Sequence, residues 1–295
     1  MSPLATQDEL STTHSPHYID RYLNANLTSR ELRNIGFPWS PAGVNRTLSS
    51  VGGTIAAART VCERLNLRKS KQESERNINS NNQIICNEKS MPAWSAHVAG
   101  GTHHAFYDYG EGFCIFSDIA VAANVILREF PHVVRNILII DLDVHQGNGN
   151  AKLFQGRDDV FTFSVHCEHN LFSAEEKSDL DIGLPAGCTD TTYTQTLNHW
   201  LNVFDKNQDK YDVIFFQAGV DVIDEDRLGK MNLSKEGLRR RNQMVYEFAR
   251  RTKKGLIITM GGGYPRSDWN PILDAHADVY LGAYHFLNET GSNLG

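Results

Sequence analysis

NILIIDLDVHQGN, at residues 136–148, is the stretch that decides the fold. The apolar run at residues 137–140 is rich in β-branched side chains, which is typical of a strand buried on both faces of a sheet. Polar residues then appear at every second position. Because side chains alternate along an extended chain, Asp141, Asp143 and His145 are predicted to point to one side. Taken alone, this pattern fits either a divalent-metal site or a strand that ends in a polar turn.

The rest of the chain alternates between predicted strands and helices, which indicates an α/β fold with a mainly parallel sheet covered on both faces. Strands are predicted at residues 96–99, 137–140, 160–165, 213–216 and 256–259, and helices at residues 16–23, 44–67, 117–129, 151–154, 190–208, 234–252 and 272–287. No internal repeat interrupts this order, so residues 1–295 are predicted to form one domain. Residues 68–90 are charged, asparagine-rich and aperiodic, and they are predicted to be a disordered surface insertion.

The composition narrows the range of partners and compartments. A net charge of −6 leaves no basic footprint for nucleic acid. The five cysteines are scattered and never form a CxxC pair, which favours reduced thiols in an intracellular compartment, the nucleus or the cytoplasm. No apolar run is long enough to span a membrane, and the N-terminus lacks the pattern of a secretory signal. The oligomeric state is left open.

Reactive residues or glycine turns follow the predicted strands at their carboxyl ends, where open parallel sheets bind ligands. They are His103 and His104, the three polar residues of the deciding stretch, His166, Asp221, and the turn that ends in Tyr264. Asp143, His145 and Asp221 would give a divalent metal three ligands and leave positions for water and substrate. Alone, Asp221 is more typical of a turn or a helix cap.

The remaining polar residues suit acid–base chemistry. Of the paired His103 and His104, one ring can act as a general base and the other can stabilise developing charge, unless one merely packs. Asp141 can hydrogen-bond a histidine and raise its basicity. Tyr264, on a triple-glycine turn, can donate its hydroxyl to an oxyanion. On their own, the glycine turn and Phe113 are weak signals. Glycine turns are common, and a phenylalanine is more often buried in a core than placed in a channel wall.

Four motifs together resemble the signatures of the zinc-dependent histone deacetylase family: GGTHHAFYDYGEGFC, IDLDVHQGNG, FQAGVD and MGGGY. The form of the second and fourth is most similar to the class IV branch and to related bacterial deacetylases. The resemblance runs from about Asp8 to the C-terminus, apart from residues 68–90. It implies the three-layer arginase/deacetylase α/β fold with an eight-stranded parallel sheet. It also implies hydrolysis of acetyl-lysine, and sometimes other acyl-lysine, amides in histones or other proteins, and hence a role in chromatin and transcription.

The resemblance also implies roles for individual residues. The zinc ligands would be Asp143, His145 and Asp221. The catalytic residues would be His104 as proton shuttle, His103 as its electrostatic partner, Asp141 paired with His103, and Tyr264 polarising the substrate carbonyl. The acyl-lysine channel would include Gly112, Phe113 and Gly262, with an opposite wall from an unnamed residue of the loop after His166. A structural potassium ion would bind the carbonyls of Asp141, Asp143, His145 and Val165, together with Ser164.

Two departures from the family pattern affect these expectations. Asn148 stands where most of the family has an aspartate paired with the second histidine, a choice that the class IV branch shares. An amide supports an imidazolium less well than a carboxylate, so His104 is expected to be less basic. The chain also begins late relative to the family pattern. We therefore expect the family's first strand to be missing and neighbouring strand edges to be exposed.

Two other functions compete with deacetylation. A two-manganese ureohydrolase of the same fold would need additional paired carboxylates, and Asp224 and Asp226 have the wrong spacing after Asp221. A catalytically silent, truncated isoform could serve as a binding module for acylated lysine or another partner. The expected loss of a strand favours this second alternative, whereas the complete ligand set and Tyr264 oppose it. Measuring the metal content tests the ureohydrolase alternative, and measuring turnover tests the silent binding module.

Overall fold

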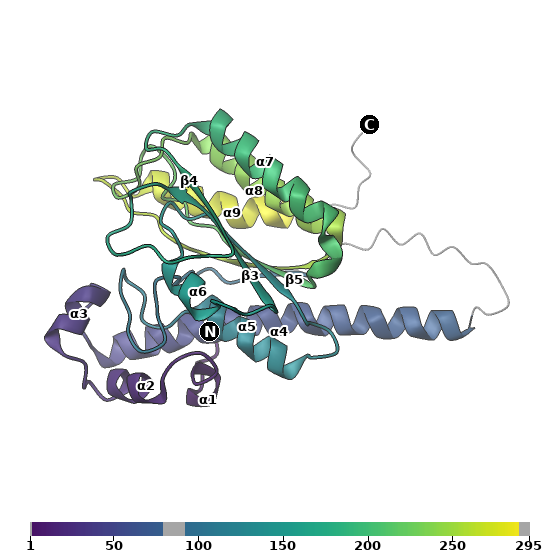
Figure 1. The fold of residues 1–295 in the computed structure, drawn as a ribbon, viewed down its shortest axis with the longest axis horizontal. Coiled ribbons are helices and arrows are strands. Elements are labelled where there is room, and N and C mark those ends of the chain that lie inside the picture. The colour runs from purple at the N-terminus through teal and green to yellow at the C-terminus, as the bar shows by residue number, and fades with distance from the viewer. Residues whose placement is uncertain (1, 79–91, 289–295) are drawn as a thin grey trace.

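The computed structural model describes residues 2–78 and 92–288. Within these residues, six parallel strands form one sheet in the order β1-β6-β5-β2-β3-β4 (Figure 1). The strands are β1 (Trp94–Ala96), β2 (Ile137–Asp141), β3 (Val160–Cys167), β4 (Leu180–Leu184), β5 (Val213–Gln217) and β6 (Gly255–Thr259). The predicted parallel α/β fold is therefore confirmed. The resemblance implied eight strands, whereas the described residues contain six, and β1, paired only with β6 among them, forms one edge.

Helices cover both faces of the sheet (Figure 1). One face carries α4 (Pro41–Ile78) and α5 (Asp118–Glu129), and the other carries α7 (Asp190–Lys206), α8 (Lys235–Thr252) and α9 (Asn270–Asn288). The shorter helices are α1 (Gln7–Leu10), α2 (Pro16–Leu23), α3 (Ser29–Ile35), α6 (Asn148–Leu153) and the 3-10 turn η1 (Gln208–Lys210). No helix in the described ranges is long and apolar enough to cross a membrane.

Strand β2 is apolar throughout because its two sides belong to two different cores. Ile137 and Ile139 pack with the core under α4 and α5, and Leu138 and Ile140 pack with the core under α7, α8 and α9. Inside the sheet, β2 pairs with β3 on one side and β5 on the other. A strand in that position has no solvent-facing side, which explains why its polar residues begin only at its carboxyl end.

The short elements α1, α3, β4 and η1 were not predicted. Helices α1 and α3 each begin with a capping box, in which Thr6 pairs with Glu9 and Thr28 with Glu31. These T-x-x-E patterns are visible in the sequence and could have located both helices. Strand β4 alternates apolar residues with Asp181 and Gly183, but it is only five residues long and mostly half-buried, so its pattern is weak.

The predicted disordered insertion at residues 68–90 is wrong in its first part, because α4 continues to Ile78. Lysine, arginine, glutamate and glutamine dominate residues 68–76, and these residue types favour a helix without an apolar face. The Lys69 ammonium group also donates to the carbonyls of His132 and Val133, each at 3.2 Å. The end of α4 extends past α5 and away from the sheet (Figure 1). Residues 79–90 of the predicted insertion lie outside the described residues.

Candidate active site

The turns after β2 and β5 bring the three predicted metal ligands together. The ligand atoms of Asp143, His145 and Asp221 all lie within 4.8 Å of one another, and all three residues are buried. His145 Nδ1 lies 3.1 Å from Asp143 Oδ1 and 3.2 Å from Asp221 Oδ2. Two carboxylates and an imidazole form a donor set that suits zinc and leaves coordination positions open.

The surroundings of these carboxylates also fit a bound cation. The backbone N–H of Val144 donates to Asp221 Oδ1 at 3.0 Å, and that of Gly262 donates to Asp143 Oδ2 at 2.7 Å. Asp221 Oδ2, by contrast, is fully buried and makes no well-aligned hydrogen bond in the described part of the chain, although His145 Nδ1 lies 3.2 Å away. A buried carboxylate oxygen without a well-aligned hydrogen bond is unfavourable unless a positive charge faces it. The residues present therefore fit a divalent metal ion.

Electrostatics lead to the same conclusion. Burial, together with the nearby Asp143 carboxylate, raises the pKa of Asp221 to about 7. Burial would lower the pKa of His145, but hydrogen bonds and charge from Asp143 and Asp221 outweigh it and raise this pKa to about 10. The cluster therefore attracts one positive charge, which either a proton on His145 or a metal cation can provide.

A fully buried arginine supports the two ligand-bearing turns from behind. Arg241, on α8, is 0% exposed, and its Nη1 donates to the carbonyls of Leu142 at 3.0 Å and Gly219 at 2.6 Å. Both carbonyls belong to the turns that carry the metal ligands. Arg241 was not predicted as a site residue because it stands in a run of three arginines on a helix. The other two members, Arg239 and Arg240, form exposed ion pairs.

The loop after β1 places His103 and His104 beside the candidate metal ligands, with their ring centroids 3.9 Å apart. His103 Nδ1 lies 2.7 Å from Asp141 Oδ2, the pairing that the resemblance implied. Burial lowers the pKa of His103, but the carboxylates of Asp141 and Asp143 outweigh it and leave the pKa raised. Burial and the neighbouring His103 hold the pKa of His104 well below its usual value. His104 is thus the neutral ring, able to accept a proton.

Asp118, at the start of α5, holds the backbone that leads into the histidine pair. The backbone N–H groups of Gly101 and Thr102 donate to its carboxylate at 3.1 and 2.8 Å. The hydroxyl of Thr54, on α4, donates to it at 2.6 Å. Asp118 was not predicted as a functional residue because an acidic residue in the first turn of a helix is ordinary.

A channel of about 280 Å³ leads to His104 and His145 between two aromatic walls. Phe113 lies on one side, with its ring centroid 5.9 Å from that of Tyr264. Phe172 lies on the other, 5.0 Å from His104. Phe172 belongs to the loop after His166, from which the family resemblance predicts the opposite wall of the channel. Leu228 also lines the channel and was not predicted.

Asp226 holds the backbone at Tyr264, and among the described residues it lies outside the three-ligand cluster. Its carboxylate accepts hydrogen bonds from the backbone N–H groups of Tyr264, Leu228 and Gly229. Burial, and then the charges of Asp221 and Asp143, raise the pKa of Tyr264, so its hydroxyl keeps its proton. Among the described residues, the cluster around Asp221 supplies three ligands, which gives no support to a two-metal ureohydrolase.

Gly262, predicted to line the channel, lies against two of the candidate metal ligands, Asp143 and Asp221. A Cβ atom at this position would be 2.0 Å from Asp221 Oδ2, so only glycine allows the backbone to approach so closely. Gly262 borders a cavity of about 660 Å³, which Gly112, Phe113 and His104 also line. Its place in the substrate channel stays a prediction.

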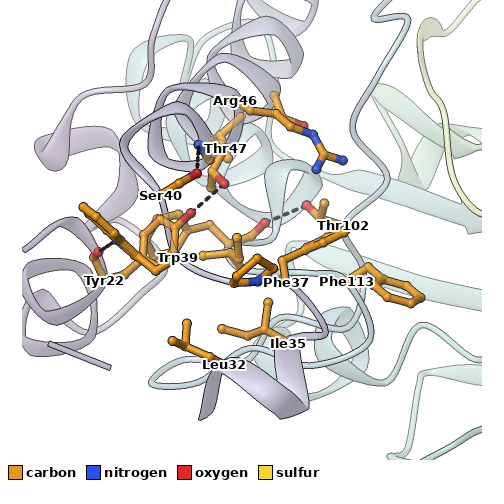
Figure 2. Close-up of a pocket in the computed structure, with 16 residues that line it drawn as sticks. Tyr22, Leu32, Ile35, Phe37, Trp39, Ser40, Arg46, Thr47, Thr102 and Phe113 are labelled. Atoms are coloured by element: carbon orange, nitrogen blue, oxygen red, sulfur yellow. Dashed lines mark hydrogen bonds between the residues drawn. The ribbon is translucent and has the colours of Figure 1, made fainter. Parts of the chain in front are cut away.

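A third cavity, of about 260 Å³, lies behind Phe113 among α2, α3 and α4 (Figure 2). Phe37, whose ring centroid lies 5.2 Å from that of Phe113, contributes to its lining, as do Trp39 and Arg46. Phe113 thus separates this cavity from the channel, because it lines both. The sequence contained no signal for the cavity, since its lining comes from four separate segments.

The predicted potassium ligands also gather near this edge of the sheet. Asp141 on β2 is in register with Ser164 on β3, and Val165 follows directly. The hydroxyl of Ser164 lies 2.9 Å from His166 Nδ1.

Asn148, predicted to support the second histidine, has its Oδ1 2.7 Å from His104 Nδ1.

Comparison with known proteins identifies the family. The histone deacetylase domain matches residues 1–279. A protein of Picosynechococcus sp., described as uncharacterized, is 40% identical over 258 residues, which cover 88% of this chain and 76% of that protein. Histone deacetylase 2 of Arabidopsis thaliana is 25% identical over 280 residues, covering 92% of this chain and 64% of the plant protein. The acetoin utilization protein AcuC of Staphylococcus aureus is 30% identical over 197 residues, covering 63% and 49%.

A solved structure shares the fold. It is that of a histone deacetylase homologue in complex with SAHA, with a TM-score of 0.70 and 23% identity, covering 97% of this chain and 71% of that one. The family match extends over nearly the whole sequence, and the motif residues meet at one edge of the sheet. The chain belongs to the histone deacetylase family.

Proposed function

We propose that the protein hydrolyses acyl-lysine amides in proteins and uses a zinc ion as its cofactor. One observation carries the proposal: the ligand atoms of Asp143, His145 and Asp221 converge within 4.8 Å at the inner end of a channel between aromatic rings. Such a channel suits the long apolar stem of an acyl-lysine side chain. The form of the sequence motifs favours a class IV-like member of the family.

Asp143, His145 and Asp221 would hold the metal ion. When bound, zinc would supply Lewis-acid chemistry, polarising the amide carbonyl and lowering the pKa of water. Gly262 and Val144 would keep the two carboxylates oriented through their backbone N–H groups.

The other residues carry protons and stabilise charge. His104 takes a proton from the attacking water at Nε2, because its Nδ1 faces Asn148 Oδ1. His103, held by Asp141, favours the negative charge that develops next to it. The hydroxyl of Tyr264 donates to the oxyanion of the tetrahedral intermediate. His104 then delivers its proton to the lysine nitrogen as the carbon–nitrogen bond breaks.

Turnover of two fluorogenic peptides, one with acetyl-lysine and one with long-chain acyl-lysine, tests this proposal together with metal analysis. We expect about one zinc per chain and hydrolysis that falls on the order of 100-fold or more in Tyr264→Phe. Tyr284→Phe, at an exposed position on α9, is the control. Zinc without turnover would leave a silent binding module, and a folded protein with neither metal nor turnover would exclude catalysis. Two manganese ions with turnover of a guanidino substrate would favour a ureohydrolase.

Thermal unfolding tests the metal site without relying on activity. Zinc that binds only the folded state should raise the Tm of the wild type, and a chelator should reverse the change. Asp221→Asn should abolish this zinc-dependent shift. Asp224→Asn, which changes an exposed carboxylate three residues away, should preserve it. An equal zinc shift in both variants would contradict the assigned ligands.

The acyl-chain preference depends in our proposal on Phe113. An acetyl group fits the inner end of the channel, whereas a long chain needs more apolar space, which the cavity behind Phe113 offers if that ring moves (Figure 2). We expect acetyl-lysine to turn over faster, and Phe113→Ala to raise the relative rate of the long-chain peptide.

Histone substrates, a role in chromatin and a structural potassium ion are further proposals that rest on the family resemblance. Replacing potassium with sodium in the thermal unfolding assay tests the potassium ion.

A further inference from the structure

A hydrogen-bonded network connects His104 to Glu111, a carboxylate that no sequence pattern singled out. Asn148 Nδ2 donates to Glu111 Oε1 at 2.9 Å and to Ser173 Oγ at 3.1 Å. The Ser173 hydroxyl in turn donates to the same Glu111 oxygen at 2.6 Å. On its other side, Asn148 Oδ1 lies 2.7 Å from His104 Nδ1 and accepts from the N–H of Gly149 at 2.9 Å. Asn148 is completely buried between the histidine and the carboxylate.

The network permits only one orientation of the Asn148 amide. The neighbours of Nδ2 are a carboxylate oxygen, a hydroxyl whose hydrogen already points to Glu111, and the carbonyl of Ala174 at 3.3 Å. All three are acceptors, so the amide nitrogen must face them and the amide oxygen must face His104. Because that oxygen can only accept, His104 must carry its hydrogen on Nδ1. The Nε2 atom of the neutral ring is then free to take a proton.

We propose that Glu111 is a positioning residue that acts through Asn148 and restores to His104 part of the support that a carboxylate at position 148 would give. The Glu111 charge draws on the Nδ2 hydrogen and increases the negative charge on Oδ1, since hydrogen bonds in a chain polarise one another. This favours the protonated form of His104 and locks its tautomer. The other titratable groups that face His104 are His103, His145 and Asp143. The inference rests on the proposed function, in which His104 transfers the proton.

Glu111 also has a structural effect, through Ser173, that an experiment must distinguish from its effect on His104. Its bond with Ser173 joins the loop that carries Phe113 to the loop that carries Phe172, the two walls of the channel. A purely structural role would affect substrate binding and raise KM. The proposed role affects the proton transfer, and should change kcat and its pH profile.

Glu111→Gln is the central variant, because it keeps an oxygen acceptor for Asn148 and Ser173 but removes the charge. In the zinc-loaded enzyme we expect kcat/KM to fall about 3- to 10-fold. The acid limb of its pH profile should move about 0.5 to 1 pH unit lower, because the base loses a stabilising charge. Adding Asn148→Asp to this variant should move the limb back. Ser173→Ala should change KM and leave the limb in place, and Glu175→Gln, at a nearby exposed carboxylate, should resemble the wild type.

Nitrogen-15 NMR of the histidine side chains reads the same effect without turnover. The zinc-loaded wild type should show His104 with its hydrogen on Nδ1, and Glu111→Gln should lower its titration midpoint. If the wild type binds zinc but hydrolyses neither peptide, the proposed function fails while the NMR comparison still tests Glu111. An unchanged pH profile and an unchanged His104 titration in Glu111→Gln would overturn the inference. So would the same KM change in Glu111→Gln and Ser173→Ala with no shift of the acid limb.

Discussion

The ring of Phe172 lies edge-on to the imidazole of His104, with centroids 5.0 Å apart and planes at 83°. The channel wall therefore packs directly on the residue proposed to transfer the proton. Phe172 is 56% exposed and belongs to a loop without regular structure. An aromatic side chain this exposed buries little surface on folding, so its position is better explained by contact with a substrate than by stability.

Replacing Phe172 with alanine should weaken substrate binding with little change in the fold. An aromatic contact contributes about 0.5 to 1.5 kcal/mol, so we expect kcat/KM to fall about 2- to 10-fold, mainly through KM. Steady-state kinetics on the acetyl-lysine peptide measures this, with circular dichroism to check the fold. Tyr284→Ala removes an equally exposed aromatic ring on α9, which does not line the channel, and should leave both parameters unchanged. A Phe172→Ala enzyme with the wild-type KM would exclude a role in the wall.

Gly112→Ala should reduce activity far more than stability. Gly112 has φ +54°, and a Cβ atom there would lie 2.2 Å from the ring of Phe172 and 2.8 Å from that of His104. Gly156 is a matched control, because it has φ +76° and nothing within 4 Å of its Cβ position. Both alanine variants should lose about 1 to 2 kcal/mol of stability through the left-handed backbone. Only Gly112→Ala should also lose activity, on the order of 100-fold, because it displaces catalytic side chains. Equal activity in the two variants would contradict the described channel.

The clustering of the three candidate metal ligands could be predicted from the sequence because parallel strands place their carboxyl ends at one edge of the sheet. The run at residues 137–140 identified a central strand, and the period-two pattern after it located Asp143 and His145. Asp221 follows the neighbouring strand β5, so the topology alone brings it close. Local pattern and global topology agree here, which makes this part of the fold predictable.

The supporting residues could not be predicted, since their roles depend on contacts between distant segments. Arg241 donates hydrogen bonds to the carbonyls of residues that are 22 and 99 positions away in the sequence. Glu111 accepts a hydrogen bond from Asn148, which is 37 positions away in the sequence. Nothing in the local pattern distinguishes such residues from ordinary surface charges. Phe172 presents a different difficulty, because its loop has no periodicity to fix the direction of a side chain. The sequence therefore predicts the ligands much better than the groups that orient them.

Arg241→Met should destabilise the protein and weaken zinc binding together. The variant leaves the carbonyls of Leu142 and Gly219 without a donor in the core, so we expect a loss of about 2 to 4 kcal/mol in the free energy of unfolding. Because these carbonyls belong to the ligand-bearing turns, zinc affinity should fall about 10- to 100-fold. Chemical denaturation and competition with a zinc chelator measure the two effects. Arg240→Met, next to it but half-exposed, should change stability by less than about 0.5 kcal/mol. If Arg241→Met keeps the stability and the zinc affinity of the wild type, the guanidinium is not needed to hold the turns.

His14 should make the stability of the fold depend on pH. The ring is fully buried, its Nδ1 lies 2.8 Å from the carbonyl of Phe106, and the N–H of Ser117 donates to its Nε2 at 2.9 Å. An imidazole that accepts at Nε2 must be neutral. Burial, only partly offset by backbone hydrogen bonds, accordingly lowers the pKa of His14 from 6.5 to about 4.

The sign of the effect follows from this shift. Above pH 6.5 the ring is neutral in both states and the fold keeps its full stability. Between pH 6.5 and about 4 the unfolded chain binds the proton that the folded chain refuses, so stability falls by up to about 3 kcal/mol. Denaturant midpoints across this range should fall less steeply in His14→Gln than in the wild type. His17→Gln, at an exposed histidine on α2, should keep the wild-type slope. If the denaturant midpoints of the wild type and His14→Gln depend on pH with the same slope, then His14 takes up no proton on unfolding. Other groups would then cause the acid sensitivity.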